Sequence, residues 1–251
     1  MRRFGSWMLT VVLMALALTA VGCKEGVPQT ALDLFIEKVS SLEADQQEET
    51  LRKLAGEGNP EAPFANYMIG NNFYTEAGAL AMESGWNGVE VNASLDSAEF
   101  YFTRALAQDS TFLEAMVNLG SLWDDRSDQM GSREDRKNRN DKAEYFYNMA
   151  LKQDPLDEKA RCNLGALYLR QRRTADALQE FQTVLDNNPR SSLAHYNLAI
   201  MFAEQKIYRE AIREWEMAVK FDPEGDIGER SRDNIKIVKD LMNAPAPDQV
   251  K

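Results

Sequence analysis

The chain has 251 residues, a formal net charge of −11 and a sequence pI near 4.8. Such an acidic chain repels phosphate groups, so its composition argues against nucleic-acid binding and against attachment to anionic lipid headgroups through bulk charge. Hydrophobic residues make up 44% of the chain, enough to build one folded domain of about 220 residues.

Residues 1–22 have the pattern of a secretory signal peptide. Arg2 and Arg3 precede an uncharged, mostly apolar stretch that ends at Cys23. The sequence Ala-Val-Gly-Cys at 20–23 resembles a bacterial lipobox, which implies cleavage before Cys23 and lipidation of that cysteine. Residue 20 is Ala where lipoboxes usually carry Leu, and residues 4–22 approach the roughly 20 apolar residues that span a bilayer, so an uncleaved signal anchor remains an alternative.

The residue after Cys23 bears on the target membrane. Lys24, rather than Asp, follows the cysteine, which resembles lipoproteins sent to the outer membrane. We therefore expect an outer-membrane lipoprotein facing the periplasm, with inner-membrane anchoring as the alternative. Residues 23–29 are expected to be a lipidated N-terminus and short linker.

The second half of the chain repeats itself every 34 residues. Pro155, Pro189 and Pro223 keep this spacing. Other positions recur in phase with them: Asn163-Leu164-Gly165 with Tyr168 returns as Asn197-Leu198-Ala199 with Phe202, and Ala177, Phe181 and Val184 return as Ala211, Trp215 and Ala218. This pattern resembles the tetratricopeptide repeat. The resemblance implies an all-α, right-handed solenoid of antiparallel helix pairs with a C-terminal capping helix.

The same pattern divides the rest of the chain. We expect a degenerate helical pair at 30–60, repeats at 61–111, 112–156, 157–190 and 191–224, a capping helix at 225–243 and a disordered tail at 244–251. The earlier two repeats contain insertions. Gly70 to Ala98 is 28 residues and Gly120 to Ala143 is 23, where Gly165 to Ala177 is 12, so the excesses are 16 and 11.

We place these insertions at 75–94 and 124–140, at the turn between the two helices of consecutive repeats, and therefore on one rim. The first insertion carries Met82, Trp86, Val89 and Val91, whereas the second holds five acids and five bases. Two interpretations remain open: tolerated surface loops, or a rim on which Trp86 anchors a partner or folds back over the groove.

The resemblance also implies a ligand groove lined by the first helix of each repeat. At the groove positions stand Tyr67, Asn71, Tyr74, Val117, Ser121, Lys159, Cys162, Ala166, Leu169, Arg170, Tyr196 and Ile200. The Lys and Asn set that clamps a terminal carboxylate in chaperone-binding members is missing. This aromatic and aliphatic lining suits an extended apolar peptide or an amphipathic helix, unless the chain's own N-terminal pair covers it.

The sequence offers little for catalysis, and we expect no enzyme, no cofactor and no metal. His195, the single histidine, falls at a helix-packing position, and Cys162 reads as a small apolar filler. In the 124–140 insertion, Arg126 and Lys137 occupy positions where an EF-hand needs acids.

These features predict a membrane-anchored scaffold of the bacterial envelope that binds proteins or peptides. The architecture resembles that of tetratricopeptide lipoproteins such as the pilotins of type IV pili and the assembly lipoproteins of Flp pili. An adaptor that recruits peptidoglycan hydrolases or proteases is the alternative.

Overall fold

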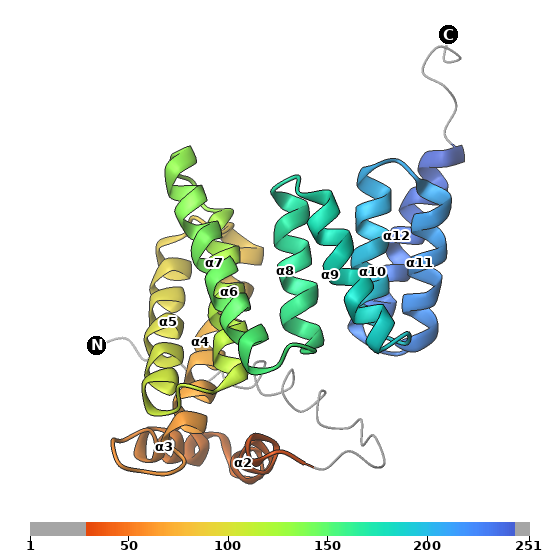
Figure 1. The fold of residues 1–251 in the computed structure, drawn as a ribbon. Coiled ribbons are helices and arrows are strands. Elements are labelled where there is room, and N and C mark those ends of the chain that lie inside the picture. The colour runs from red at the N-terminus through yellow and green to blue at the C-terminus, as the bar shows by residue number, and fades with distance from the viewer. Residues whose placement is uncertain (1–28, 244–251) are drawn as a thin grey trace. The chain divides into compact units, whose positions relative to one another are not determined.

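The computed structural model describes residues 29–243, and the predicted signal peptide, Cys23 and the C-terminal tail lie outside this range. Within it the chain is all-α, as predicted, with eleven helices and no strand. The chain divides into two compact units, up to Arg139 and from Asn140, and the boundary falls inside one helix. Figure 1 shows helix hairpins in each unit.

The first unit begins with a short helical pair. Helix α2 (Ala31–Ser40) starts at a capping box, in which the Thr30 hydroxyl accepts from the Asp33 amide and the Asp33 carboxylate accepts from the Thr30 amide. Helix α3 (Ala44–Leu54) follows. Phe35, Val39 and Leu51 are buried in one cluster with residues from the start of the next helix. The predicted 30–60 segment therefore contains two helices that share a core.

The next hairpin holds the first long repeat. Helices α4 (Ala62–Ser84) and α5 (Val89–Gln108) pack along each other. A Cβ on Gly70 would lie 2.7 Å from the Phe102 ring, so only glycine allows this approach without a shift. The 75–94 insertion is almost entirely helical, and only residues 85–88 form a turn. Of the two interpretations left open, a long surface loop does not describe this segment, because 75–84 is rich in Ala, Leu, Met and Glu, which are good helix formers.

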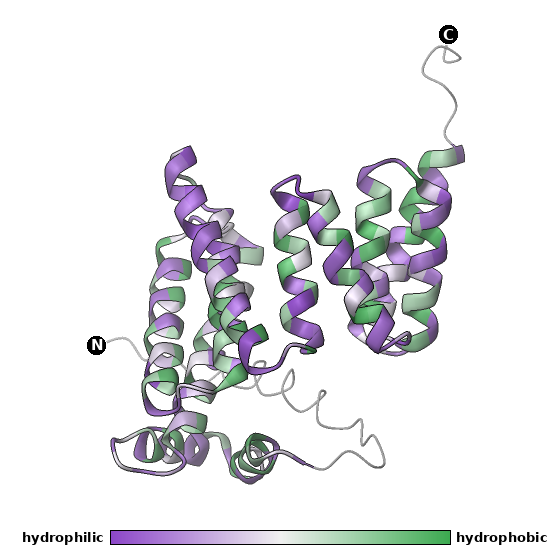
Figure 2. Cartoon of the chain, in the orientation of Figure 1, coloured by the Kyte–Doolittle hydropathy of each residue, from purple (hydrophilic) through white to green (hydrophobic). Residues whose placement is uncertain are grey.

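The second insertion also lengthens helices. Helix α6 (Leu113–Ser127) packs against α5, and α7 (Arg133–Gln153) starts after a turn at 128–132. Ser132 and Asp135 exchange hydrogen bonds between side chains and backbone amides, at 2.9 and 3.1 Å, which fixes where α7 begins. The N-terminal half of α7 is hydrophilic throughout (Figure 2), so it can remain helical without joining the core.

The second unit keeps the 34-residue period in its backbone. Helices α8 (Glu158–Arg170) and α9 (Thr174–Asn187) are followed by α10 (Ser192–Glu204) and α11 (Tyr208–Phe221), each starting 34 residues after its counterpart. The turns repeat too, since Arg172 and Lys206 both adopt positive φ angles, 65° and 62°. Gly165 faces the Phe181 ring in the same way that Gly70 faces Phe102.

The last helix closes this unit. Helix α12 (Asp226–Asn243) packs against α11 and α10, and the Asp222 carboxylate accepts from the Ile227 amide at 3.1 Å. Val238 joins a buried cluster with Ala211 and Trp215. The helix therefore covers the apolar face of the last repeat.

Candidate functional site

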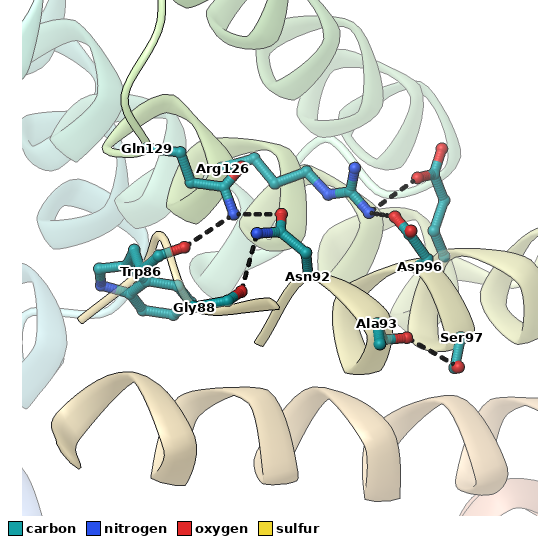
Figure 3. Close-up of polar contacts among 9 residues, drawn as sticks. Trp86, Gly88, Asn92, Ala93, Asp96, Ser97, Arg126 and Gln129 are labelled. Carbon is teal, nitrogen blue, oxygen red and sulfur yellow. Dashed lines mark hydrogen bonds and ion pairs between the residues drawn. The ribbon is translucent and has the colours of Figure 1, made fainter. Parts of the chain in front are cut away.

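The two inserted segments of the first unit are joined by hydrogen bonds at their turns (Figure 3). The side-chain amide of the buried Gln129 donates to the Trp86 carbonyl oxygen at 3.0 Å and to Asn92 Oδ1 at 2.9 Å. The backbone N–H of Met130 donates to Asn87 Oδ1 at 2.6 Å. We call this set of contacts, from residues 86–92 to 129–130, the clasp. It shows that the two insertions lie side by side on one rim, as their positions in the repeats predicted.

Arg126, in the last turn of α6, also joins α6 to α5 close to the clasp. Its guanidinium lies 2.6 Å from the Asp96 carboxylate and 3.3 Å from Glu99, and its side chain is only 13% exposed. The Arg139 guanidinium donates to the backbone carbonyls of Arg126 and Gln129. Partial burial makes these charge-assisted contacts less screened than ordinary surface pairs.

The predicted rim residues do not all face solvent. Met82 and Val89 are 89% and 86% exposed, Trp86 is half-buried, and Val91 is fully buried. Val91 cannot contact a partner as a surface residue, because the first turn of α5 directs it to the interior beside Gly88. Met130, which is 82% exposed, was missed. The sequence did contain an indication of this exposed position, because Met130 is an apolar residue in an otherwise polar insertion.

In the first unit, predicted groove residues connect α4 to α6. The Asn118 amide donates to Asn71 Oδ1 at 2.6 Å and to the Tyr67 hydroxyl at 3.3 Å, while the Tyr74 hydroxyl donates to Asp125. Burial raises the pKa of the Tyr67 phenol above its ordinary value.

Exposure varies across this set. Tyr67 and Val117 are buried, whereas Asn71, Tyr74 and Ser121 are partly exposed. Several polar groups of these residues already form hydrogen bonds within the unit.

In the second unit, the predicted groove residues are also unevenly exposed. Lys159 and Arg170 are exposed, Ala166, Tyr196 and Ile200 are half-buried, and Cys162 and Leu169 are buried. Cys162 packs with Val184 and Ala194. Burial raises the pKa of its thiol far above the usual range, and the negative charge of Glu158 raises it further. A thiol held protonated is a poor nucleophile, which supports its interpretation as a core filler.

His195 is similarly held by its surroundings. The ring is 8% exposed, with Nδ1 2.7 Å from a Glu214 carboxylate oxygen and Nε2 3.3 Å from the Pro189 carbonyl oxygen. It therefore occupies a packed position between α10 and α11, joined to its neighbours through both ring nitrogens.

Residues 29–243 contain neither a metal-binding cluster nor a membrane-spanning helix. No group of three or more His, Cys, Asp or Glu side chains in this range is arranged to hold a metal ion. No helix in the same range combines the length and apolar character needed to cross a bilayer.

The fold and its small-residue and aromatic contacts define a helical-repeat scaffold. Residues 162–226 match the family described as Tetratricopeptide repeat, so this part of the chain carries the repeat that its sequence predicted. Proteins built from these repeats are protein-interaction scaffolds and are generally non-catalytic. A search of curated proteins finds no match to this sequence.

Solved structures of the same fold include three bacterial proteins. A thermophilic tetratricopeptide repeat protein of Thermus thermophilus has a TM-score of 0.62 and 14% identity, covering 92% of this chain and 98% of its own. PilF of Pseudomonas aeruginosa has a TM-score of 0.52 and 16% identity, covering 95% of each chain. A Parabacteroides merdae repeat protein has a TM-score of 0.51 and 18% identity, covering 94% of this chain and 81% of its own. At these identities the similarity establishes the fold alone.

Proposed function

We propose that this chain is a non-enzymatic, membrane-anchored scaffold that gathers protein partners in the bacterial envelope during assembly of a pilus or secretion machine. The observation that carries the proposal is the tandem repeat itself, which matches the tetratricopeptide family at 162–226 and recurs in the backbone of α8 to α11. Stacked helix pairs present side chains along an extended surface, which suits the binding of other proteins.

Anchoring through Cys23 is the second part of the proposal. The lipobox-like sequence at 20–23 supports it, since a lipidated cysteine there would begin the mature chain. Each buried methylene of an acyl chain contributes about 0.8 kcal/mol, so the two or three chains of a bacterial lipoprotein give stable attachment. An acidic chain needs such an anchor because its bulk charge does not attract anionic lipid.

The assignment to pilus or secretion assembly comes from the resemblance in architecture to pilotin-type tetratricopeptide lipoproteins. PilF of Pseudomonas aeruginosa is among the structures of similar fold, which is compatible with this assignment. The non-enzymatic part is supported by the buried Cys162 thiol with its raised pKa and by the enclosed His195 ring.

Membrane fractionation tests the anchor. The full-length chain should sediment with membranes after a high-salt wash and be released by detergent, whereas the Cys23→Ser chain should appear in the soluble envelope fraction. Mass spectrometry of the purified unmodified chain should find an acylated Cys23 as its first residue, and an unacylated chain that still carries residues 1–22 would contradict lipidation and favour an uncleaved signal anchor.

Capture of partners tests the scaffold. Cross-linking in intact cells, followed by purification of the full-length chain, should enrich pilus or secretion components over a matched envelope lipoprotein. Enrichment of peptidoglycan hydrolases or proteases instead would replace the assembly proposal with the adaptor alternative.

A further inference from the structure

The clasped rim of the first unit holds exposed apolar side chains in a fixed frame. Met82 lies in the last turn of α4, Val89 in the first turn of α5 and Met130 in the turn before α7. Their exposed fractions are 89%, 86% and 82%. The hydrogen bonds of the clasp join the turn that carries Met130 to the turn between α4 and α5, because the Met130 amide donates to Asn87 and Gln129 donates to Trp86. A backbone held in this way loses less conformational entropy when a partner binds than a free loop would, although the exposed side chains still become ordered.

The chain around Met82 and Val89 carries charge of one sign, whereas Met130 lies in an insertion that holds both acids and bases. Between Lys53 and Arg104 the chain has seven acids and no Lys or Arg. Glu83 and Glu90 follow Met82 and Val89 directly, and both are exposed. Neither glutamate forms an ion pair or side-chain hydrogen bond within residues 29–243. At the tip of the α4–α5 hairpin, the end of α4 and the start of α5 therefore each present one apolar side chain next to one carboxylate that has no ion-pair partner in the part of the chain that the structure describes.

Glu83 also has an unfavourable position in its helix. It lies in the last turn of α4, where the helix dipole is negative, and this turn contains no basic residue. A cation near the C-terminal end of a helix is stabilising and an anion there is not. A positively charged partner group would relieve this local repulsion, whereas the chain's own residues in that turn do not.

We propose that Met82, Glu83, Val89, Glu90 and Met130 form a docking surface, the acidic rim, for a basic amphipathic helix of a partner protein. Apolar side chains of the partner helix would pack on the two methionines and the valine, and its flanking Lys or Arg side chains would pair with the two glutamates. The proposal rests on the scaffold function above and names the chemical class of its partner.

Two other occupants fit the surface less well. An anionic lipid surface is disfavoured at Met82 and Val89, because no Lys or Arg lies between residues 54 and 103. A second copy of the chain would supply bases from the start of α7, at Arg133 and Arg136. However, that segment also carries Glu134 and Asp135, so its charge complements the acidic rim only in part.

The test measures binding of a synthetic peptide to the full-length chain by fluorescence anisotropy. The probe is a short amphipathic helical peptide of leucine and lysine, and its partner probe has glutamate in place of every lysine. We expect the lysine peptide to bind, its affinity to fall with added salt, and the glutamate peptide to bind at least about tenfold more weakly.

Two double variants locate the binding. Met82→Ser with Val89→Ser, and Glu83→Gln with Glu90→Gln, should each weaken the lysine peptide at least about tenfold. The controls are Leu34→Ser with Leu156→Ser and Glu49→Gln with Glu216→Gln, which change exposed apolar and acidic residues elsewhere. Both controls should bind as the unmodified chain does, and circular dichroism should show the same helical content in all five chains.

Several results would overturn the proposal. These are no binding of the lysine peptide, equal binding by the rim variants, and equal loss in the control variants, which would indicate attraction to bulk charge. A rim variant that dissociates a dimer of the unmodified chain would assign the surface to a second copy, and one that loses binding to phosphatidylglycerol vesicles would assign it to the membrane. If envelope partners are still captured while the acidic rim fails these tests, the scaffold function stands and only the rim assignment is lost.

Discussion

The two units use the same packing contact but differ in what lies beyond it. Gly70 faces Phe102 in the first unit, and Gly165 faces Phe181 in the second. Yet α4 and α5 have 23 and 20 residues, whereas α8 and α9 have 13 and 14. A repeat is thus defined where its helices meet through small and aromatic residues, and additional turns can be added at one end without disturbing that contact.

Removing the aromatic rings should have the largest effect. Phe102→Ala and Phe181→Ala each leave a cavity in a fully buried site, and we expect each to lower the free energy of unfolding by about 3–5 kcal/mol. Denaturant unfolding monitored by circular dichroism measures this change. Phe100→Ala, at a residue that is 55% exposed, is the control and should change stability little. A small effect at only one of the two buried sites would show that the units do not share the contact.

Adding one methyl group in α4 should have opposite effects at two glycines. Gly70→Ala forces the new Cβ against the Phe102 ring, so we expect a loss of about 1–3 kcal/mol. Gly78→Ala, in the same helix, meets nothing within 4 Å and should stabilise by up to about 1 kcal/mol, because alanine is the better helix former. Thermal unfolding of both variants measures the difference. Equal effects would contradict the close helix approach at Gly70.

Breaking the clasp should affect only the extended unit. Gln129→Ala removes two hydrogen bonds and leaves the Trp86 carbonyl and Asn92 without their partner, at a cost of about 1–3 kcal/mol. Hydrogen exchange should increase at 85–92 and 128–132. Gln205→Ala, which removes one local bond to the Met201 carbonyl, is the control and should leave exchange in those turns unchanged. Unchanged protection at the rim in Gln129→Ala would show that these contacts do not hold it.

High pH should weaken the second unit through Tyr168. Burial, followed by the Glu144 carboxylate that accepts its hydroxyl at 3.0 Å, raises the pKa of Tyr168 from 10.0 to about 12. The unfolded chain loses this proton at a lower pH than the folded chain does. The contribution of the protonated Tyr168 hydroxyl to stability is therefore complete below pH 10 and disappears as the pH rises to about 12. The slope is at most about 1.4 kcal/mol per pH unit.

Tyr168→Phe separates this contribution from other alkaline effects. Urea unfolding across this pH range should show a shallower fall in stability for the variant than for the unmodified chain. A parallel fall in both chains would rule out Tyr168 as a source of the alkaline instability.

The sequence predicted the repeats well because their packing is local and periodic. The positions of Gly165 and Phe181 repeat in phase, and the helices form where that pattern indicates. The form of the insertions could not be read in the same way. Composition near 75–84 favours helix, but the pattern gave no indication of where α4 ends, which depends on Gly85 adopting a φ of 77°.

The candidate site was only partly predictable for a related reason. Trp86 was singled out for its size, but its exposure depends on the clasp, which joins residues 43 positions apart in the sequence. Val91, which was expected on the rim, is buried, whereas Met130, which the sequence pattern did not single out, is exposed. Such long-range polar contacts follow from how two turns meet, which no repeat pattern encodes.

The acidic-rim proposal places the choice of partner in the extended repeats of the first unit and not in the regular repeats of the second. Quantitative mass spectrometry of cross-linked partners in intact cells would compare the unmodified chain, the acidic-rim variant Met82→Ser with Val89→Ser, and a regular-repeat variant, Lys159→Ala with Arg170→Ala. We predict that the rim variant loses the specific partners, while the regular-repeat variant retains most of them. Loss of the same partners in the regular-repeat variant, with full retention in the rim variant, would contradict the account.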